Sequence, residues 1–410
     1  MRATALAPKA PTAAASTPTS SVRITTGATP TPSGSPTLIA AAPTTASGGA
    51  TTSLSARYNK YQVGAYYFSG WSHGLNNNVT PQLTGQYPGS EPLIGWYDDS
   101  QQLVDKTIVQ AADAGVNFFA FDWYDIAMST SPTDRTLNEA LDFYMTSSQR
   151  KRLSFCLTYI DQPPFIPATG TLSAQHWSQL ITTWLTYMKQ PDYVRVNGKP
   201  LFIVFSPERF DKIFGGVAGV RAALDELRAR ARADGLPGVS IAIAATVVPK
   251  SNPARVATLN AEGYDLATGY NYHSLGDEQY GVPAPYSNLV TENMNTWNQV
   301  SSRVNAPYIP VVTSGFDLRY SSRSNEKSTA IIYGGRTPHR FACFAVQARH
   351  WIDTHPHQTT QEHIVMIYAW NELAEGGAII PTRQDGYAYA NAVREVFGSA
   401  AQAPATPSCP

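Results

Sequence analysis

The chain has 410 residues, with 30 basic and 30 acidic side chains and a formal net charge of zero at pH 7. A chain without net charge has no overall attraction for nucleic acid or an anionic membrane surface, so neither is an expected partner. No apolar run reaches the roughly 18–20 residues that a membrane span needs. Three cysteines are an odd, low number, which excludes a disulfide framework. Cys156 and Cys343 lie in apolar runs and are expected to be buried thiols, whereas Cys409 lies in the tail.

Residues 1–57 consist almost entirely of Ala, Thr, Pro, Ser and Gly. This composition cannot bury enough apolar surface to offset the entropy lost on ordering, so the segment is predicted to be disordered. Such segments commonly tether extracellular enzymes, which favours a secreted or envelope location, although residues 1–7 lack the apolar region of a secretory signal. Residues 401–410 are predicted to be a second disordered tail. The folded domain is therefore expected to span residues 58–400.

From Tyr61 onward, short apolar runs alternate with longer helical patterns, which is typical of strand–helix–strand units around a parallel sheet. Strands are predicted at 63–67, 118–122, 153–157, 201–205, 240–245, 266–270, 308–312 and 364–369. Helices are predicted near 100–114, 135–147, 173–188, 217–233, 253–261, 287–304, 339–353 and 386–397. Eight strands alternating with eight helices predict an α/β fold of the (β/α)8 TIM-barrel type.

Two local signals refine this prediction. Asn197 followed by Gly198 predicts a hairpin that leads into the fourth strand. The Gly- and Pro-rich stretch at 274–285 is the clearest site for an insertion before the sixth helix. A doubly wound open sheet is the alternative fold. It would normally carry a Gly-rich phosphate loop after the first strand, and residues 69–74 do not fit that pattern.

The stretch at 364–378 is the first candidate site, because the active site of a barrel lies at the carboxyl ends of its strands. An apolar run ends there on Trp370, Asn371 and Glu372, and Glu375 follows three residues later. Two carboxylates at this spacing lie on one side of a turn, which suits the two-carboxylate hydrolysis of a glycosidic bond. Trp370 offers a flat face to a sugar ring, and Asn371 offers an amide to a hydroxyl. The alternative is a helix N-terminus with acidic residues in its first turn.

The other strand ends combine aromatic rings with hydrogen-bonding side chains, as a carbohydrate site requires. One such residue alone is more often a packing or capping residue, so only their convergence favours a sugar site. The candidate substrate-binding residues at these ends are Tyr66, Tyr67, Trp71, Asp122, Trp123, Tyr124, Tyr159, Asn271, Tyr272, His273, Asp317 and Arg319. The chain contains no H-E-x-x-H or C-x-x-C motif, so neither a metal nor a cofactor is expected.

The sequence Tyr-Ala-Trp-Asn-Glu-Leu-Ala-Glu-Gly at 368–376 resembles the W-N-E-W-x-E-G motif of glycoside hydrolase family 99 and the related WbsX-like domains. Residues 64–71, 114–124, 193–200 and 315–317 resemble further segments of that family, so the resemblance covers roughly residues 61–398. One position departs from the motif, because Leu373 stands where the family usually has a second Trp. Substrate contacts near that position are therefore expected to differ.

The resemblance implies a barrel enzyme of the retaining endo-α-mannosidase or endo-α-mannanase type. It implies that Glu372 acts as the base on the substrate 2-hydroxyl and Glu375 as the general acid/base, through a 1,2-anhydro sugar. Two nearby carboxylates do not ionise independently, so one is expected to keep its proton as the acid while its partner stays charged. The expected function is hydrolysis of internal α-glycosidic linkages in a polysaccharide or oligosaccharide. Among these linkages, α-mannosidic ones are the candidate that the resemblance suggests.

Two alternatives remain open at this point. A retaining barrel glycosidase could use Glu208, soon after the fourth strand, as acid/base and Asp317 as nucleophile, which predicts that Glu208 points into the active-site cleft. A glycosyltransferase-like or glycan-binding protein of a polysaccharide assembly cluster is the second alternative, because WbsX-like domains occur in such clusters. Hydrolysis of a glycan without a nucleotide-sugar donor would exclude the second.

Overall fold

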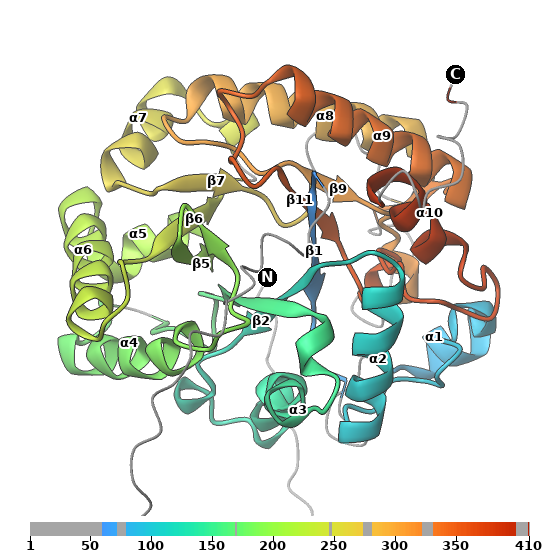
Figure 1. The fold of residues 1–410 in the computed structure, drawn as a ribbon, viewed down its shortest axis with the longest axis horizontal. Helices are drawn as coiled ribbons and strands as arrows, with labels where there is room; N and C mark the ends of the chain where they lie inside the picture. The colour runs from blue at the N-terminus through green and yellow to red at the C-terminus, as the bar shows by residue number, and fades with distance from the viewer. Residues whose placement is uncertain are drawn as a thin grey trace, which may run out of the picture. The chain divides into compact units, whose positions relative to one another are not determined.

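Eight parallel strands form a nearly closed barrel in the computed structural model, which describes residues 60–71, 79–168, 170–245, 248–273, 281–321, 331–398 and 409 (Figure 1). The strands are β1 (Gln62–Tyr67), β2 (Phe118–Trp123), β3 (Ser154–Tyr159), β5 (Lys199–Val204), β6 (Ser240–Ala244), β7 (Leu266–Thr268), β9 (Val311–Thr313) and β11 (Ile364–Tyr368). Their order is β7-β6-β5-β3-β2-β1-β11-β9, and a parallel bridge between Ala267 and Tyr308 completes the ring. The predicted barrel is confirmed.

Helices surround the barrel on its outer side (Figure 1). Those that correspond to predicted helices are α2 (Gln101–Asp113), α3 (Glu139–Thr146), α4 (Ala174–Met188), α6 (Val217–Ala233), α7 (Pro253–Glu262), α8 (Tyr286–Arg303), α9 (Pro338–Thr354) and α10 (Ala388–Phe397). Two shorter helices were not predicted, α1 (Pro81–Gln86) and α5 (Pro207–Phe214). The helix that the sequence indicated between the fourth and fifth strands is therefore preceded by α5.

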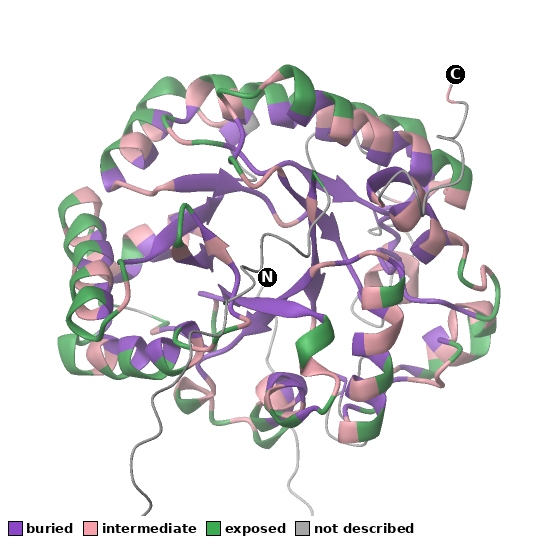
Figure 2. Cartoon of the chain, in the orientation of Figure 1, coloured by how far each residue is buried: buried purple, intermediate pink, exposed green. Residues whose placement is uncertain are grey.

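The core lies on both sides of the strands, as Figure 2 shows by their buried colour and by the exposed outer faces of the helices. All six residues of β2 and all six of β3 are buried. Strands that are covered on both faces read as continuous apolar runs, and these runs are what identified the strands in the sequence. On α4 the buried side chains recur at helical spacing, at Trp177, Leu180, Ile181, Trp184, Leu185 and Met188. This stripe packs toward the barrel.

Local signals in the sequence fix where several helices begin and end. The side chains of Ser100, Ser173 and Thr337 accept hydrogen bonds from the first turns of α2, α4 and α9. The predicted hairpin is also present, because β4 (Arg195–Val196) pairs antiparallel with β5. Asn197 and Gly198 between them have φ angles of 51° and 74°, the left-handed conformations that a tight hairpin turn requires.

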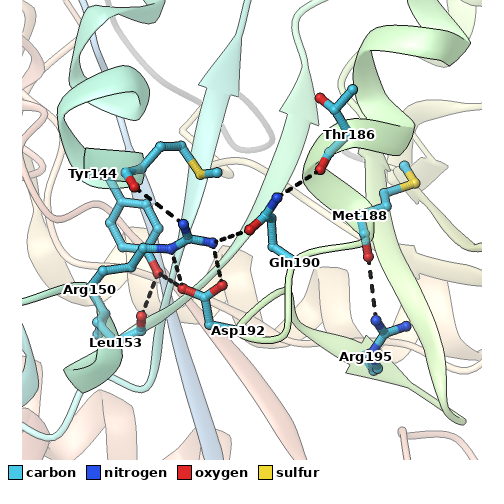
Figure 3. A network of polar contacts seen from close by, with 9 residues as sticks. Tyr144, Arg150, Leu153, Thr186, Met188, Gln190, Asp192 and Arg195 are labelled. Atoms are coloured by element: carbon cyan, nitrogen blue, oxygen red, sulfur yellow. Dashed lines mark hydrogen bonds and ion pairs between the residues drawn. The ribbon is translucent and has the colours of Figure 1, made fainter. Parts of the chain in front are cut away.

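A polar network ties together the segments that lead into β3 and β5, at the amino-terminal face of the barrel (Figure 3). The Arg150 guanidinium donates to both carboxylate oxygens of Asp192, each at 2.6 Å, and to Gln190 Oε1 at 3.0 Å. The Tyr144 hydroxyl lies 2.5 Å from the Leu153 carbonyl oxygen and 3.1 Å from Asp192 Oδ2. A hollow of about 1370 Å³ adjoins this network. In barrel enzymes this face contributes stability, and the chemistry lies at the opposite face.

The cysteine prediction was wrong for Cys343. This residue is only partly buried on α9 and forms a disulfide with Cys409, with a Cα–Cα distance of 5.4 Å. Cys156 is a buried free thiol, as expected. The two cysteines are 66 positions apart and the cysteine count is odd, so the sequence gave no signal for this pairing.

The remaining described segments include a small parallel pair of strands, β8 (Ala284–Pro285) and β10 (Tyr333–Gly334). The predicted disordered segment at 1–57, most of the tail at 401–410 and residues 274–280 of the predicted insertion lie outside the described residues. Within the described part of the chain, no helix is both long and apolar enough to cross a membrane.

Candidate active site

Three side chains from distant parts of the chain meet at the carboxyl ends of β2, β7 and β11. Tyr270 follows β7, and its hydroxyl oxygen lies 2.6 Å from Asp122 Oδ2 and 3.0 Å from Glu372 Oε1. Asp122 is the fifth residue of β2, and Glu372 follows β11. Asp122 and Glu372 are almost fully buried, with 2% and 8% of their surfaces exposed. The structure thus brings together two carboxyl groups that the sequence placed at the second and eighth strand ends.

The second glutamate of the motif lies on a 3-10 turn, Leu373–Glu375, that directly follows Glu372. The Tyr368 hydroxyl donates to Glu375 Oε2. Glu375 is partly exposed, unlike Glu372. The turn ends at Gly376 with a φ of 67°, and a Cβ at this position would lie 3.0 Å from the Cβ of Asp317. Glycine is therefore required here both for its conformation and for the close approach of the neighbouring loop.

The electrostatic setting disfavours extra negative charge on this cluster. Burial raises the pKa of the Asp122 carboxyl well above its usual range, the Glu375 charge adds to the rise, and the Tyr270 hydroxyl opposes it. Burial also raises the pKa of Tyr270, and the neighbouring charges of Asp122 and Glu372 add to that rise. The pKa of Tyr368 is raised by burial and by the charges of Glu375 and Glu372. Both tyrosines are therefore neutral hydroxyls at physiological pH.

The loop after β9 supports the turn that carries the two glutamates. The Asp317 backbone N–H donates to the Glu375 carbonyl oxygen at 2.7 Å, and Arg336 Nη1 donates to the Gly376 carbonyl oxygen at 2.9 Å. The Asp317 carboxylate is paired with Arg319, whose Nη2 lies 2.5 Å from Asp317 Oδ2. Asp317 thus acts on the site through its backbone, while its carboxylate is neutralised by Arg319.

A second group of predicted residues lies after β7. The His273 ring stacks on Phe316, with 3.7 Å between ring centroids, and its Nδ1 lies 2.7 Å from Asn271 Oδ1. Burial, with a smaller effect of the Lys250 charge, lowers the pKa of His273 to about 4. His273 is therefore neutral at pH 7. Because Asn271 Oδ1 can only accept, His273 carries its proton on Nδ1 and leaves Nε2 as an acceptor.

Several residues predicted to bind substrate lie in the core instead, with their rings against other aromatic side chains or their hydroxyls bonded to neighbours. These residues are Tyr67 against Phe119 and Phe121, Trp71 against Tyr97, Trp123 against Tyr159 and Trp184, Trp370 against Phe119, and Tyr272 bonded to the Tyr308 hydroxyl. Each is less than 9% exposed. Their size and partners assign them to packing of the barrel.

Three further predicted residues have defined partners. Asn371 is fully buried, and its amide accepts from the Phe68 N–H at 2.9 Å and donates to the Phe68 carbonyl at 2.8 Å. Both of its hydrogen-bonding groups thus hold the segment after β1 in place. The Tyr66 ring lies against Tyr270, with 4.7 Å between centroids. The Tyr124 ring packs on Phe165, with 4.8 Å between ring centroids. The Asn138 side-chain amide accepts from the Tyr124 N–H and donates to the Tyr124 carbonyl oxygen.

The prediction from sequence missed Tyr270 and Tyr368, whose hydroxyls contact Glu372 and Glu375. Both lay inside the predicted strands at 266–270 and 364–369, and neither was named as a site residue, although Tyr66, Tyr67 and Asp122 at the ends of other predicted strands were. The structure ends β7 at Thr268, so Tyr270 already lies beyond the strand. A signal was present, since Tyr270 directly precedes Asn271, and Tyr368 lies only four residues before Glu372.

Glu208, the acid/base of the alternative site, is not part of the cluster formed by Asp122, Tyr270 and Glu372. Glu208 occupies the first turn of α5, and one of its oxygens is 3.7 Å from Arg255 Nη2.

A hollow of about 190 Å³ adjoins the Leu373–Glu375 turn, with Asp317, Arg319 and Gly376 in its lining. Within the residues that the structure describes, no cluster of three or more His, Cys, Asp and Glu side chains is arranged to hold a metal ion.

A family model described as Glycosyltransferase WbsX matches residues 66–393. The chain belongs to this family. The match confirms the relationship predicted from the motif at 368–376. Comparison with curated proteins finds no match for this WbsX-family chain.

Solved structures support the fold of this WbsX-family protein. A protein described as glycoside hydrolase-like superposes with a TM-score of 0.59 at 17% identity, covering 83% of this chain and 94% of that one. The family 99 endo-alpha-mannosidase from Bacteroides thetaiotaomicron superposes with a TM-score of 0.50 at 14% identity, covering 79% and 88%. At these identities the likeness concerns the barrel fold alone.

Proposed function

We propose that this protein is a retaining endo-glycoside hydrolase that cleaves internal α-glycosidic linkages of a polysaccharide. The observation that carries the proposal is the placement of Glu372 and Glu375 on one turn after β11, each held by a different tyrosine. Two carboxyl groups with different surroundings are what an acid and a base at one glycosidic bond require. The family 99 endo-alpha-mannosidase that shares this barrel fold makes cleavage of an α-linked glycan the first activity to test.

In the proposed first step, the Glu372 carboxylate accepts the proton of the substrate 2-hydroxyl while O2 forms a bond to C1. The Glu375 carboxyl gives its proton to the leaving oxygen as the C1–O bond breaks. A water molecule then attacks C1 and opens the 1,2-anhydro ring. Glu375 takes a proton from this water, and Glu372 returns its proton to O2, so two inversions give net retention.

The two tyrosines suit this cycle because a hydroxyl can both donate and accept. Tyr368 can donate to Glu375 when the glutamate is ionised and accept from it when it is protonated. The partly exposed position of Glu375 suits a group that must reach the leaving oxygen and then a water molecule. Glu372, which is more deeply buried, needs to reach only the 2-hydroxyl.

The proposed substrate is a neutral α-linked glycan, with an α-mannan as the first to test. Equal numbers of acidic and basic residues favour a neutral substrate. Leu373 replaces the second Trp of the family motif and is buried, so a sugar ring cannot stack on an indole at this position. The preference among α-linked sugars is therefore expected to differ from that of family 99 enzymes.

The family's description as a glycosyltransferase is a specific reason to test the alternative activity. The protein should be incubated with α-mannan and related α-glycans without any nucleotide sugar, and the products sized over time. We expect early release of mid-sized oligosaccharides, which indicates cleavage of internal linkages. Glu372→Gln and Glu375→Gln serve as inactive controls. Glycan extension that requires a nucleotide-sugar donor, with no hydrolysis, would replace the proposal by transfer.

We further propose that the protein acts in an oxidising compartment, outside the cytoplasm or in the cell envelope. The Cys343–Cys409 disulfide supports this location, because such bonds persist mainly in secreted and envelope proteins. The test is the intact mass of the native protein after alkylation, with and without prior reduction. Alkylation of all three cysteines without reduction, in protein isolated from its own cells, would contradict the proposed location.

A further inference from the structure

Tyr270 occupies the centre of a hydrogen-bonded row that runs from Asp122 on β2 to Glu372 after β11. Its hydroxyl oxygen is within hydrogen-bonding distance of both carboxyl groups, at 2.6 Å and 3.0 Å. A phenol has one proton to donate, and an ionised carboxylate can only accept. One hydroxyl cannot donate to two carboxylates at once. For both short contacts to be hydrogen bonds, one of the two carboxyl groups must be protonated, in addition to the proton on the Tyr270 hydroxyl.

We propose that Asp122 is a positioning residue that carries this proton at neutral pH: it donates to the Tyr270 oxygen, and Tyr270 donates to Glu372, which is thereby held as a carboxylate. The role of Glu372 as a base rests on the proposed function. The protonation of Asp122 does not, and it can be measured without any substrate.

The surroundings of Asp122 indicate that the proton resides there. The side chain is 2% exposed, and its Oδ1 is buried without a hydrogen-bond partner among the described residues. An ionised carboxylate in that position would have one donor, Tyr270, for two oxygens, and burying an unpaired charge is costly. Besides burial, the groups that act on Asp122 within the described chain are the Tyr270 hydroxyl and, when it is ionised, the Glu375 carboxylate. Neither supplies the positive charge that would favour ionisation.

The row is fixed before any substrate binds. The Tyr270 ring is packed by Tyr66 from β1 at 4.7 Å, by Phe205 after β5 at 5.0 Å, and by Tyr368 from β11 at 5.2 Å. Among the described residues, the titratable groups that act on Tyr270 most strongly are Asp122, Glu372, Tyr368 and Tyr124, and the Tyr66 ring packs against it; none of these five is basic. Its hydroxyl therefore cannot turn away from the two carboxyl groups, and a hydrogen bond donated to Glu372 favours its charged form.

The direct test is infrared difference spectroscopy at pH 7 on the full chain labelled with carboxyl-13C aspartate. We expect a protonated-carboxyl carbonyl band that shifts with the label and is lost in Asp122→Asn. Tyr270→Phe should move the same band, because the acid loses its acceptor. Tyr308→Phe is the matched control, since it removes a buried phenol hydroxyl that bonds Tyr272 rather than a carboxyl group. If neither Asp122→Asn nor Tyr270→Phe alters a label-sensitive band, the proposal is overturned.

The two variants also separate the charge states through kinetics, once a substrate is found. Tyr270→Phe should move the acid limb of the kcat/KM profile up by about one pH unit, because Glu372 loses a donor to its charged form. Asp122→Asn should leave that limb within a few tenths of a unit, whatever its effect on kcat, because a neutral amide replaces a neutral acid. A downward shift of about one unit in Asp122→Asn would mean that a negative charge had been removed, and would overturn the proposal. A protein that hydrolyses no glycan would remove the proposed function, while the infrared result would still decide the protonation of Asp122.

Discussion

Glu372 and Glu375 are three residues apart, yet they occupy different environments. Glu372 is almost buried beside Tyr270, whereas Glu375 is partly exposed beside Tyr368. Environments that differ in this way are what separates an acid from a base when both are carboxyl groups. The division of roles can therefore be tested one residue at a time.

Glu375→Gln should cripple hydrolysis of the natural polymer but spare an activated aryl glycoside of the same sugar. The leaving group of the aryl substrate departs without protonation, so only the polymer needs the acid. General acid catalysis contributes about 10²–10⁴-fold, and the two substrates should differ by a factor of that order. The measurement is kcat/KM for the variant and the wild type on both substrates.

Glu372→Gln should lose activity on both substrates, because the 2-hydroxyl needs its base whatever the leaving group. A 2-deoxy substrate should be inert even with the wild-type enzyme. Equal losses for the two variants on both substrates would refute the division of roles. A stable 2-fluoroglycosyl adduct would replace the anhydro route by a covalent nucleophile.

At the scale of single residues, sequence reasoning could group side chains at the strand ends but could not give the direction of each one. Placing chemistry at strand ends correctly singled out Asp122, Glu372 and Glu375 as neighbours of one another. It could not tell that Tyr66 lies against Tyr270 while the adjacent Tyr67 packs on Phe119, because successive side chains of a strand point to opposite faces. The exact register of each strand end decides this, and periodicity fixes ends only approximately.

Among the structural elements, the turn after β11 carries both glutamates of the proposed active site. Gly376→Ala should lower the unfolding free energy by roughly 1–2 kcal/mol through its left-handed conformation and should also reduce turnover. The reduction arises because the new Cβ would lie 3.0 Å from Asp317 Cβ and displace the turn. Chemical denaturation and kcat on the best substrate provide the measurements.

Gly386→Ala is the matched control for this change. Gly386 also has a positive φ, of 52°, but an added Cβ there meets no atom within 4 Å. It should lose stability by a similar amount and keep its turnover. If both variants keep full turnover, the close approach of the two loops does not matter for catalysis.

The network at the amino-terminal face tests a different element, the entry into β3. Arg150→Ala should lower the unfolding free energy by roughly 2–4 kcal/mol, because it leaves the mostly buried Asp192 carboxylate without its bidentate partner. Arg152→Ala removes an ion pair with Asp113 in which both side chains are about half exposed, and should cost less than about 1 kcal/mol. Urea denaturation of both variants measures the losses, and equal losses would show that the mostly buried Arg150–Asp192 pair contributes no more to stability than a surface ion pair (Figure 3).

The order and kind of these elements were predictable because buried strands and one-sided helices have different periodicities. The short helix α5 was missed, since Ser206 and Pro207 immediately after β5 were not recognised as its start. The disulfide was missed for another reason. Pairing of Cys343 with Cys409 depends on where the tail lies in space, which no local pattern encodes.

For the whole molecule, the dependence of stability on pH is set by carboxyl groups that folding buries. Glu262 at the end of α7 is fully buried, and burial raises its pKa to about 7 from an ordinary value of 4.5. The Arg255 guanidinium, 3.4 Å away, opposes this rise, but it also serves Asp211 and Glu208. Asp211 and Glu208 add negative charge that disfavours ionisation of Glu262.

The sign of the effect follows from proton binding. Between pH 4.5 and about 7 the folded protein keeps the Glu262 proton, whereas the unfolded chain has lost it. The unfolded state therefore binds fewer protons, and the unfolding free energy falls as pH rises through this window. Glu262→Gln should remove this contribution. The variant should match the wild type near pH 4.5 and exceed its stability at pH 8 by roughly 1–3 kcal/mol.

Urea denaturation at half-unit steps from pH 4.5 to 8 measures the difference between the two slopes. Glu226→Gln is the control, because Glu226 is a partly exposed glutamate on α6 that forms an ion pair with Arg230 at 3.9 Å. It should leave the slope of the wild type unchanged. Parallel curves for wild type and Glu262→Gln would show that Arg255 compensates the buried charge fully, in which case Glu262 is ionised in the folded protein across the whole range and contributes no pH dependence.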